Sequence, residues 1–359
     1  MKKLRRSALR QMSNWGLWGS ASWLGSSARM LQASGTASGS SAAALSASAA
    51  LVSAQTAQAQ TAQGAVTRIL VGFPPGQATD QVARMVAERL STALGSPFIV
   101  DNRPGQGGSL VLSQLAKAPA DGLTLTLSAL AGYSVNPYLY RNVSYDSVRD
   151  FAPIVMVADL PLALAVHPSV PANTLAELLA YARANPEKLA HCSSGSGTLS
   201  HLMMEDLKQR AEVKILHVPY QGSPKAIVDL IGGNVQVGLD TVTVLAPHVR
   251  SGKLKLLAVG TRARLPAFAD TPTIAESGFA GFEAVAWIAM SAPAGTPLAM
   301  RERINAEVNR ALREPEFSQK LLAIGAQPRG GSVDELGAIF RSEQQRWKAL
   351  VERTGVKAD

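Results

Sequence analysis

The stretch ILVGFPPGQATDQVARMVAERL, residues 69–90, constrains the fold more than any other part of the chain. An apolar run leads into a Pro-Pro-Gly loop, and residues 79–94 then carry apolar side chains at the spacing of one helix face. The same order of strand, glycine loop and helix recurs at 102–109, 192–201 and 217–224. Strands that alternate with helices in this way predict an α/β fold with largely parallel sheets.

Apolar segments and helix-end signals divide the rest of the chain. The segments predicted as strands are 67–73, 97–102, 123–129, 161–167, 188–194, 213–220, 235–240, 254–260 and 284–293. Thr174 with Glu177 predicts a capping box, and Ser223 before Pro224 predicts an N-cap with proline at the first helical position. Two strand regions, 161–171 and 284–297, are places where the chain is expected to cross between two bodies. We therefore expect a discontinuous first lobe, 66–165 with 289–359, and a second lobe at 166–288.

The first 59 residues read as an export signal. The formal charge of the chain is +9, and residues 1–67 hold six basic residues and no acidic one, which leaves 9 − 6 = +3 for the rest. A basic start, a long Ala/Ser/Gly tract and Ala57-Gln58-Ala59 fit a signal peptide with a small-x-small cleavage site. Arg5-Arg6 leave both the Sec and the twin-arginine route open, and a disordered tail is the alternative reading.

The mature chain is expected to be soluble in the periplasm, because no segment has 18 uninterrupted apolar residues. Cys192 is the single cysteine, so neither an intrachain disulfide nor a lipid anchor at the mature start is expected. A buried thiol and a ligand contact are both open for it. The near-neutral mature chain has no basic footprint for nucleic acid.

The glycine loops place backbone N–H groups at the positive ends of helices, which is a geometry for binding carboxylate or phosphate. None of them is a nucleotide motif: GxxxxGK[ST] does not occur, and SGSGTLSH lacks the third glycine of GxGxxG. No Lys or Arg lies in 73–81 or 192–201, so a carboxylate would be held by backbone dipoles and neutral donors. Any one such loop is more often a simple turn, and only their number favours a binding site.

Other functions fit the residues less well. Ser196, His201 and Asp240 allow a Ser/His hydrolase on an α/β scaffold, but Ser196 does not lie in a GxSxG elbow. The five histidines show no HExxH-like spacing, so no metal site and no cofactor are expected. Asp80 either stabilises its helix start or repels an anion, and Tyr220 is either a cleft wall or a core residue. A transcriptional effector would need an N-terminal helix-turn-helix, which residues 1–65 do not suggest.

From about Val66 to its C-terminus the chain resembles the tripartite tricarboxylate transporter substrate-binding proteins, the Bug family. The resemblance lies in FPPGQATD, VDNRPGQGG, SSGSGTLSHL, HVPYQGSPKAIVDLIGGNVQVGLD, SGKLKLLAVGTRAR and DTPTIAESGF followed by APAGTP, in this order. It implies a type II periplasmic binding fold, in which two α/β lobes joined by two crossover strands enclose a ligand in the cleft between them. It also implies a non-enzymatic receptor for a small organic acid, which serves either a transporter with integral membrane subunits as partners or a related sensing role. We expect the mature protein to be a monomer that closes on its ligand.

In that family the loops matching Phe73–Asp80 and Ser193–His201 hold a ligand carboxylate from opposite lobes. The family usually has PPGG in the first loop, and this chain has Gln77 in place of the second glycine. A side chain there is expected to narrow the pocket or to donate a hydrogen bond. The ligand-binding residues expected in this chain are Phe73, Pro75, Gly76, Gln77, Thr79, Asp80, Ser128, Ser193, Ser194, Gly195, Ser196, Gly197, Thr198, His201, Tyr220 and Asp240.

Overall fold

The computed structural model describes residues 65–357, so the predicted export signal lies outside the described residues. Within that range the strands form a 10-stranded sheet in the order β2-β1-β3-β9-β4-β7-β5-β6, with β8 and β10 also paired to β4. The first elements are β1 (Thr67–Val71), α2 (Ala78–Leu94), β2 (Phe98–Asn102), η1 (Gln106–Gly108), α3 (Ser109–Leu115), β3 (Thr124–Ala129), η2 (Ala131–Val135) and α4 (Asn136–Leu139). Strand β1 pairs in parallel with both β2 and β3.

A long strand, β4 (Phe151–Val166), then leads into a second group of elements. These are α5 (Leu175–Ala184), β5 (Ala190–Ser193), α6 (Leu199–Ala211), β6 (Leu216–Pro219), α7 (Ser223–Ile231), β7 (Val237–Thr241), α8 (Val242–Arg250), β8 (Lys255–Val259) and η3 (Pro266–Phe268). Strand β5 pairs in parallel with β6 and β7. The chain returns through β9 (Val285–Pro293) and ends in α9 (Leu298–Arg313), α10 (Pro315–Ala323), β10 (Gln327–Pro328) and α11 (Val333–Thr354).

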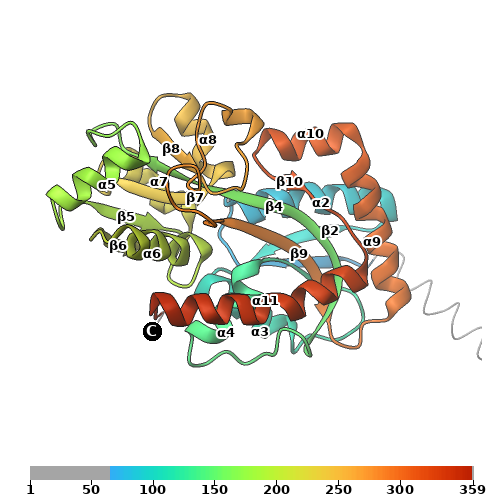
Figure 1. Cartoon of the computed structure of the whole chain (residues 1–359). Helices are drawn as coiled ribbons and strands as arrows, with labels where there is room; N and C mark the ends of the chain where they lie inside the picture. The colour runs from blue at the N-terminus through green and yellow to red at the C-terminus, as the bar shows by residue number, and fades with distance from the viewer. Residues whose placement is uncertain (1–64, 358–359) are drawn as a thin grey trace, which may run out of the picture. The chain divides into compact units, whose positions relative to one another are not determined.

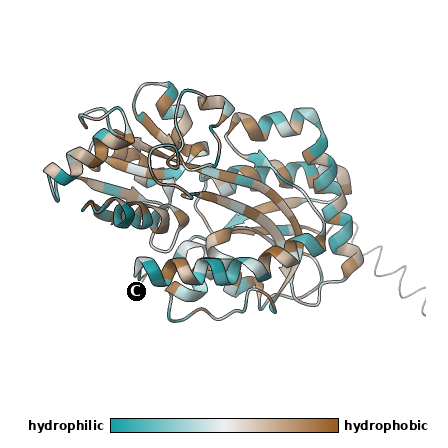
Figure 2. Ribbon diagram, viewed as in Figure 1, coloured by the Kyte–Doolittle hydropathy of each residue, from teal (hydrophilic) through white to brown (hydrophobic). Residues whose placement is uncertain are grey.

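Strands β4 and β9 connect the two α/β groups, which we call the first lobe (around β1–β3) and the second lobe (around β5–β8) (Figure 1). They pair antiparallel from Phe151–Pro293 to Pro161–Val285. Strand β9 continues the pairing to β3, and the later part of β4 pairs with β7 and β8. Figure 2 shows hydrophobic residues along both of these long strands, as expected for strands covered on both faces.

The predicted strand 161–167 was too short, because β4 begins ten residues earlier, at Phe151 rather than at Pro161 (161 − 151 = 10). Its two prolines occupy places where the strand tolerates a missing N–H. Pro153 lies beside a register shift, and Pro161 closes the pairing with β9.

Of the two predicted helix starts, the one at Thr174 is confirmed and the one at Ser223 is displaced by one residue. Thr174 caps α5 by accepting a hydrogen bond from Glu177 N, but the Glu177 carboxylate accepts from Asn173 N rather than from Thr174 N. The N-cap prediction for Ser223 was wrong: Gly222 is the N-cap of α7, with φ 102°, and Ser223 is already the first helical residue. The reason is that the Ser223 hydroxyl bonds elsewhere, to Asp240.

The C-terminal helix α11 packs back on η2 and β4. Tyr133 of η2 stacks on Phe340 of α11 with ring centroids 4.5 Å apart, and on Trp287 of β9 at 5.8 Å. Trp347 of α11 is fully enclosed. Among the helices of residues 65–357, none is long and apolar enough to cross a membrane.

Candidate ligand-binding site

A small cavity of about 40 Å³, the inner cavity, lies where three helices begin. The first turns of α2 and α6 and the residues leading into α8 all contribute to its wall. Its lining residues are Phe73, Gln77, Ala78, Thr79, Ala129, Ala131, Leu160, Leu162, Ser194, Thr198, Leu199, Ser200, Asp240, Thr241 and Ala286. Many of them lie just beyond the carboxyl ends of parallel strands, where ligands bind in open α/β sheets.

A larger cavity of about 580 Å³, the outer cavity, shares Phe73 and Ser194 with the inner one. Loops of both lobes form its wall. Its lining residues are Gly72, Phe73, Pro74, Pro104, Gly105, Gln106, Gly107, Tyr140, Ser194, Gly195, Ser196, Pro219, Tyr220, Gln221, Gly222 and Lys225. The two cavities are therefore neighbours, and we refer to them together as the cleft, with the inner cavity as its inner end.

The first turns of α2 and α6 present free backbone donors to the inner cavity. Neither N-cap residue, Gln77 or Thr198, caps its own helix with its side chain. Thr198 Oγ1 instead donates to Gly195 O at 2.7 Å and contacts Ser200 Oγ. The first N–H groups of a helix have no partner within the helix. Because one helix comes from each lobe, an anion in this cavity would meet two positive helix ends.

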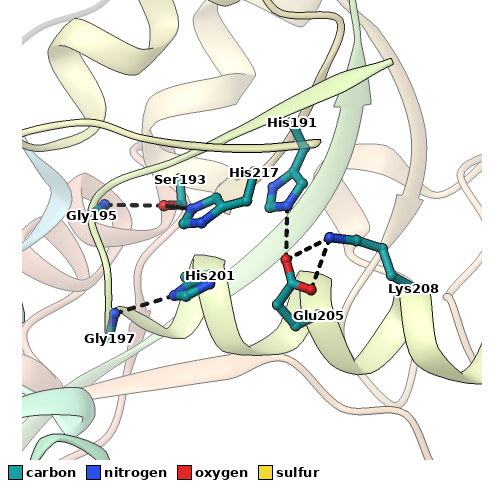
Figure 3. A network of polar contacts seen from close by, with 8 residues as sticks. All are labelled: His191, Ser193, Gly195, Gly197, His201, Glu205, Lys208 and His217. Carbon is teal, nitrogen blue, oxygen red and sulfur yellow. Dashed lines mark hydrogen bonds and ion pairs between the residues drawn. The ribbon is translucent and has the colours of Figure 1, made fainter. Parts of the chain in front are cut away.

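Histidine side chains support the glycine loop at residues 193–197 (Figure 3). Gly197 N donates to His201 Nδ1 at 3.3 Å, and Gly195 N donates to Ser193 Oγ at 3.3 Å. Ser193 Oγ in turn shares a hydrogen bond of 2.7 Å with His217 Nε2. The His201 and His217 rings stack with centroids 3.9 Å apart and planes 10° apart. The shape of this loop is therefore set by side chains that do not themselves line the cavity.

Burial keeps these histidines neutral. It lowers the pKa of His201 to about 4 and the pKa of His217 to about 3. Burial alone raises the pKa of Glu205, but hydrogen bonds from His191 and Lys208 lower it to about 2.

The ligand atoms of His201, Glu205 and His217 lie within 4.8 Å of one another, which raises the question of a metal ion. The lone pairs of an imidazole lie in its ring plane, so two rings stacked in parallel cannot both aim at one ion. The Lys208 ammonium also occupies both oxygens of Glu205. This group is thus a packed support for the loop and not a chelating site.

Asp240 is the one carboxyl group that lines the inner cavity. It is 6% exposed and lies near the end of β7, two residues before α8 begins. Its Oδ2 accepts from Ser223 Oγ at 2.7 Å and its Oδ1 from Thr241 N at 2.6 Å. Burial raises its pKa to about 6, so the group is largely protonated in mild acid and ionised at neutral pH.

Gln77 is among the residues that line the inner cavity. Its side chain also accepts a hydrogen bond that the sequence did not predict. Gln77 Oε1 accepts from Ser223 N, the first amide of α7, at 3.2 Å. The donor lies on the second lobe, so this bond joins the two lobes.

The structure brings part of the predicted set to the cleft. The predicted residues that line one or both cavities are Phe73, Gln77, Thr79, Ser194, Gly195, Ser196, Thr198, Tyr220 and Asp240. The predicted residues that line neither are Pro75, Gly76, Asp80, Ser128, Ser193, Gly197 and His201.

Gly76 and Asp80 lie outside the cavity walls because they bond to each other. Gly76 N donates to Asp80 Oδ2 at 2.8 Å, so this amide is not available to a ligand. Asp80 also accepts from Asn102 Nδ2 at 2.9 Å and pairs with Arg84 at 2.9 Å. Burial raises the pKa of Asp80, yet these partners lower it overall. Asp80 therefore fixes the first loop, the structural role that its position at a helix start indicated.

The other predicted residues outside the walls have different reasons. Pro75 is exposed on the outer side of the loop. Ser128 is fully buried within β3, and its Oγ has no hydrogen-bond partner among the described residues. Tyr220 lines the outer cavity, and its hydroxyl donates to Asp229 Oδ2 at 2.6 Å. Its ring, and not its hydroxyl, is what the cleft can use.

The glycine loop at residues 104–107 lines the outer cavity but was not among the predicted ligand-binding residues, although the motif NRPGQGGS had indicated a loop there. Asn136 holds this loop by donating from Nδ2 to Gln106 O and Gly107 O. Tyr140 was also missed; its hydroxyl donates to Ser196 O at 2.7 Å, which is another hydrogen bond between the lobes. Lys225 at the cleft mouth had no signal beyond its place after a glycine loop.

The residues of the hydrolase alternative do not form a triad. His201 Nδ1 accepts from Gly197 N, and Asp240 bonds to Ser223 and Thr241. Within residues 65–357, no hydrogen bond joins Ser196, His201 and Asp240 to one another. A nucleophile, base and orienter would need such bonds.

Comparison with proteins of known sequence gives consistent relatives. The chain is 40% identical over 283 residues to a Pseudomonas sp. (strain P51) protein described as "UPF0065 protein in tcbD-tcbE intergenic region", covering 79% of this chain and 84% of that protein. It is 36% identical over 291 residues to the protein BugT of Bordetella pertussis, covering 81% of this chain and 89% of the relative.

Solved structures share the fold. A structure titled "R. palustris Rpa4515 with adipate" has a TM-score of 0.79 at 35% identity, covering 81% of this chain and 98% of the other. The periplasmic binding protein BugD gives a TM-score of 0.78 at 33% identity, with coverage of 81% and 98%. MatC from Rhodopseudomonas palustris, with bound malate, gives 0.75 at 29% identity, with coverage of 80% and 98%. The periplasmic binding fold that the sequence predicted is thereby confirmed.

The family model of the "Tripartite tricarboxylate transporter family receptor" matches residues 82–356, which is most of the described chain. This is a family of solute receptors, so the expectation of a receptor and not an enzyme is met by family membership, and the hydrolase alternative finds no support. The chain belongs to the tripartite tricarboxylate transporter receptor family.

Proposed function

We propose that the protein captures a small organic acid by holding one carboxylate group in the inner cavity. The observation that carries this proposal is the convergence of the α2 and α6 N-termini, one from each lobe, on a cavity lined by no Lys or Arg. Each helix end contributes about 0.3–1 kcal/mol to holding an anion, and up to ~2 kcal/mol when partly buried.

The sizes of the cavities indicate how such a ligand would lie. The inner cavity of about 40 Å³ has room for a carboxylate group, while the outer one of about 580 Å³ has room for the body of the acid. The outer wall offers the rings of Phe73, Tyr140 and Tyr220 and a single cation, Lys225. The relatives whose titles name adipate and malate bind acids of this kind.

We propose that this function serves transport or a related sensing role. The family consists of periplasmic receptors, so this chain acts in the periplasm. We further propose that it is exported by removal of residues 1–59, works as a monomer without a lipid anchor, and delivers its ligand to integral membrane transporter subunits. The lobes are proposed to divide at 66–165 with 289–359 and at 166–288, so that a carboxylate touching both favours the closed form.

A ligand screen tests the proposal. Thermal shift followed by calorimetry should compare adipate, malate, citrate, glutamate and benzoate with glucose and spermidine. At least one acid should raise the melting temperature in a concentration-dependent way, because a ligand that binds only the folded state stabilises it. If only the sugar or the polyamine stabilised the protein, the organic-acid assignment would be wrong.

A further inference from the structure

Gln77 occupies an unusual position for a helix N-cap residue. It precedes α2 on the first lobe, is 7% exposed, and does not cap its own helix. Its Oε1 instead accepts a hydrogen bond from Ser223 N, 146 residues further along the chain, on the second lobe. Ser223 is itself fully buried, so its amide has no access to bulk water.

The two loops that Gln77 joins are in direct contact. A Cβ at Gly222 would collide with the Pro74 ring and would lie 3.0 Å from Gln77 Oε1. A buried amide without a partner costs free energy, so Ser223 N requires an acceptor at this point. The amide of Gln77 supplies it, where a glycine in the same place would leave this donor to a ligand or a water molecule.

Because Ser223 N fixes which end of the Gln77 amide is the acceptor, the other end must be a donor. Gln77 lines the inner cavity, and its Nε2 makes no hydrogen bond to another described residue. We propose that Gln77 is a specificity-determining residue that joins ligand recognition to lobe contact: Oε1 holds α7, and Nε2 donates to the ligand carboxylate.

The ligand half of this inference rests on the proposed function, whereas the contact between Gln77 and α7 does not. The arrangement selects ligand groups that accept hydrogen bonds and disfavours ammonium or amide N–H groups at the inner end of the cleft. Because Ser223 N, the first donor of α7, is already bonded to Gln77, the ligand is held by the N-terminal ends of α2 and α6.

Three substitutions separate the two ends of the amide. Gln77→Leu keeps the size of the side chain and removes both functions. Gln77→Glu keeps an acceptor for Ser223 N but replaces the inward donor by a negative charge. Gln77→Asn keeps the amide but is one methylene shorter, and since asparagine is a favoured N-cap residue this variant should fold. The matched control is Gln81→Leu, because the Gln81 amide bonds only to Gly76 O and lines neither cavity.

Two measurements are needed on each folded protein. Amide exchange at Ser223, followed by NMR without ligand, reports the contact with α7. Calorimetry with adipate and malate reports the inward donor. Exchange at Ser223 should be roughly two- to tenfold faster in the Leu and Asn variants, as for the loss of one neutral hydrogen bond, and unchanged in the Glu variant. Affinity should fall by roughly the same factor in the Leu variant and by more than about tenfold in the Glu variant, where charge repulsion is added. The Gln81→Leu control should match the parent in both.

Unchanged exchange at Ser223 in both the Leu and Asn variants would overturn the contact with α7. A Glu variant that bound the acids as tightly as the parent would overturn the inward donor. If the parent bound neither adipate nor malate nor any other acid, the ligand half would fail together with the proposed function, and the exchange measurement would still decide the lobe contact.

Discussion

Lowering the pH from 8 to 5.5 should strengthen the binding of a carboxylate ligand, because Asp240 shares the inner cavity with it. The pKa of Asp240 is raised by burial to about 6, so its charge falls within this pH range. Above the pKa the ionised side chain repels an anionic ligand, and below it the neutral carboxyl group does not. The buried His201 and His217, with pKa values of about 4 and 3, stay neutral throughout.

The size of the effect follows from the size of the cavity. A carboxylate held in about 40 Å³ beside Asp240 lies in its immediate neighbourhood. Two unit charges roughly 5 Å apart, at an effective dielectric constant of about 20, repel by about 3 kcal/mol. Solvent entering through the outer cavity reduces this, so we expect about 1–2 kcal/mol, or roughly five- to thirtyfold in affinity.

Calorimetry with malate at several pH values between 5.5 and 8 measures this change, and Asp240→Asn is the comparison. The Asn variant has no charge to lose, so its affinity should stay nearly constant over the range. An affinity of the parent that did not change with pH, or an equal slope in Asp240→Asn, would refute the reasoning.

The same group affects folding stability with a definite sign. The folded pKa of about 6 lies above the ordinary 3.8, so folding favours the protonated form. This contribution to stability is fully present below pH 3.8 and is lost as the pH rises through 6. The pKa difference of 6 − 3.8 = 2.2 limits the contribution to about 3 kcal/mol. Urea denaturation should therefore show that the free energy of unfolding of Asp240→Asn rises relative to that of the parent between pH 4 and pH 7. Altered hydrogen bonds in the variant shift this difference by a constant amount and do not change its rise with pH.

Further predictions concern the loops. Gly197→Ala should weaken ligand binding at least tenfold in calorimetry, because its φ is +75° and a Cβ there would lie 3.0 Å from Asn136 Oδ1. In Gly76→Ala a Cβ would meet only Pro224 Cγ, at 3.9 Å, so the φ of +83° should cost only about 1 kcal/mol of stability and the variant should still bind. Tyr140→Phe removes the hydroxyl bond to Ser196 O and should cost about 0.5–1.5 kcal/mol of ligand affinity, so a parent-like value would show that this contact between the lobes does not matter. His201, whose pKa is lowered by burial to about 4, contributes about 2 kcal/mol of stability above pH 6.5 that is lost as the pH falls toward 4. His217 adds a loss over the same range, so between pH 7 and 4.5 the fall in the free energy of unfolding, measured by urea titration, should be about 2 kcal/mol smaller in His201→Gln than in the parent.

The alternation of strands and helices, the glycine loops and the family could be predicted from the sequence because each is carried by local patterns. A strand next to a Gly loop and a helix start is specified by residues within about 20 positions of one another, as in 69–90. The same holds for the cap at Thr174. The prediction failed at the first half of β4, where Pro153 disguises a strand whose pairing with β9 is set by residues more than a hundred positions away.

Which groups line the two cavities was decided by the tertiary structure alone. Sequence placed Gly76 at the site as a donor, but its amide bonds to Asp80, and the loop 104–107 lines the cleft instead. Gln77 was identified as a departure from the family, yet its role depends on Ser223, which only folding brings to it. The physical reason is that a local pattern fixes where a helix begins and how many donors it exposes. Whether a donor is used by a neighbour or left for a ligand depends on distant segments, and those meet only in the packed molecule.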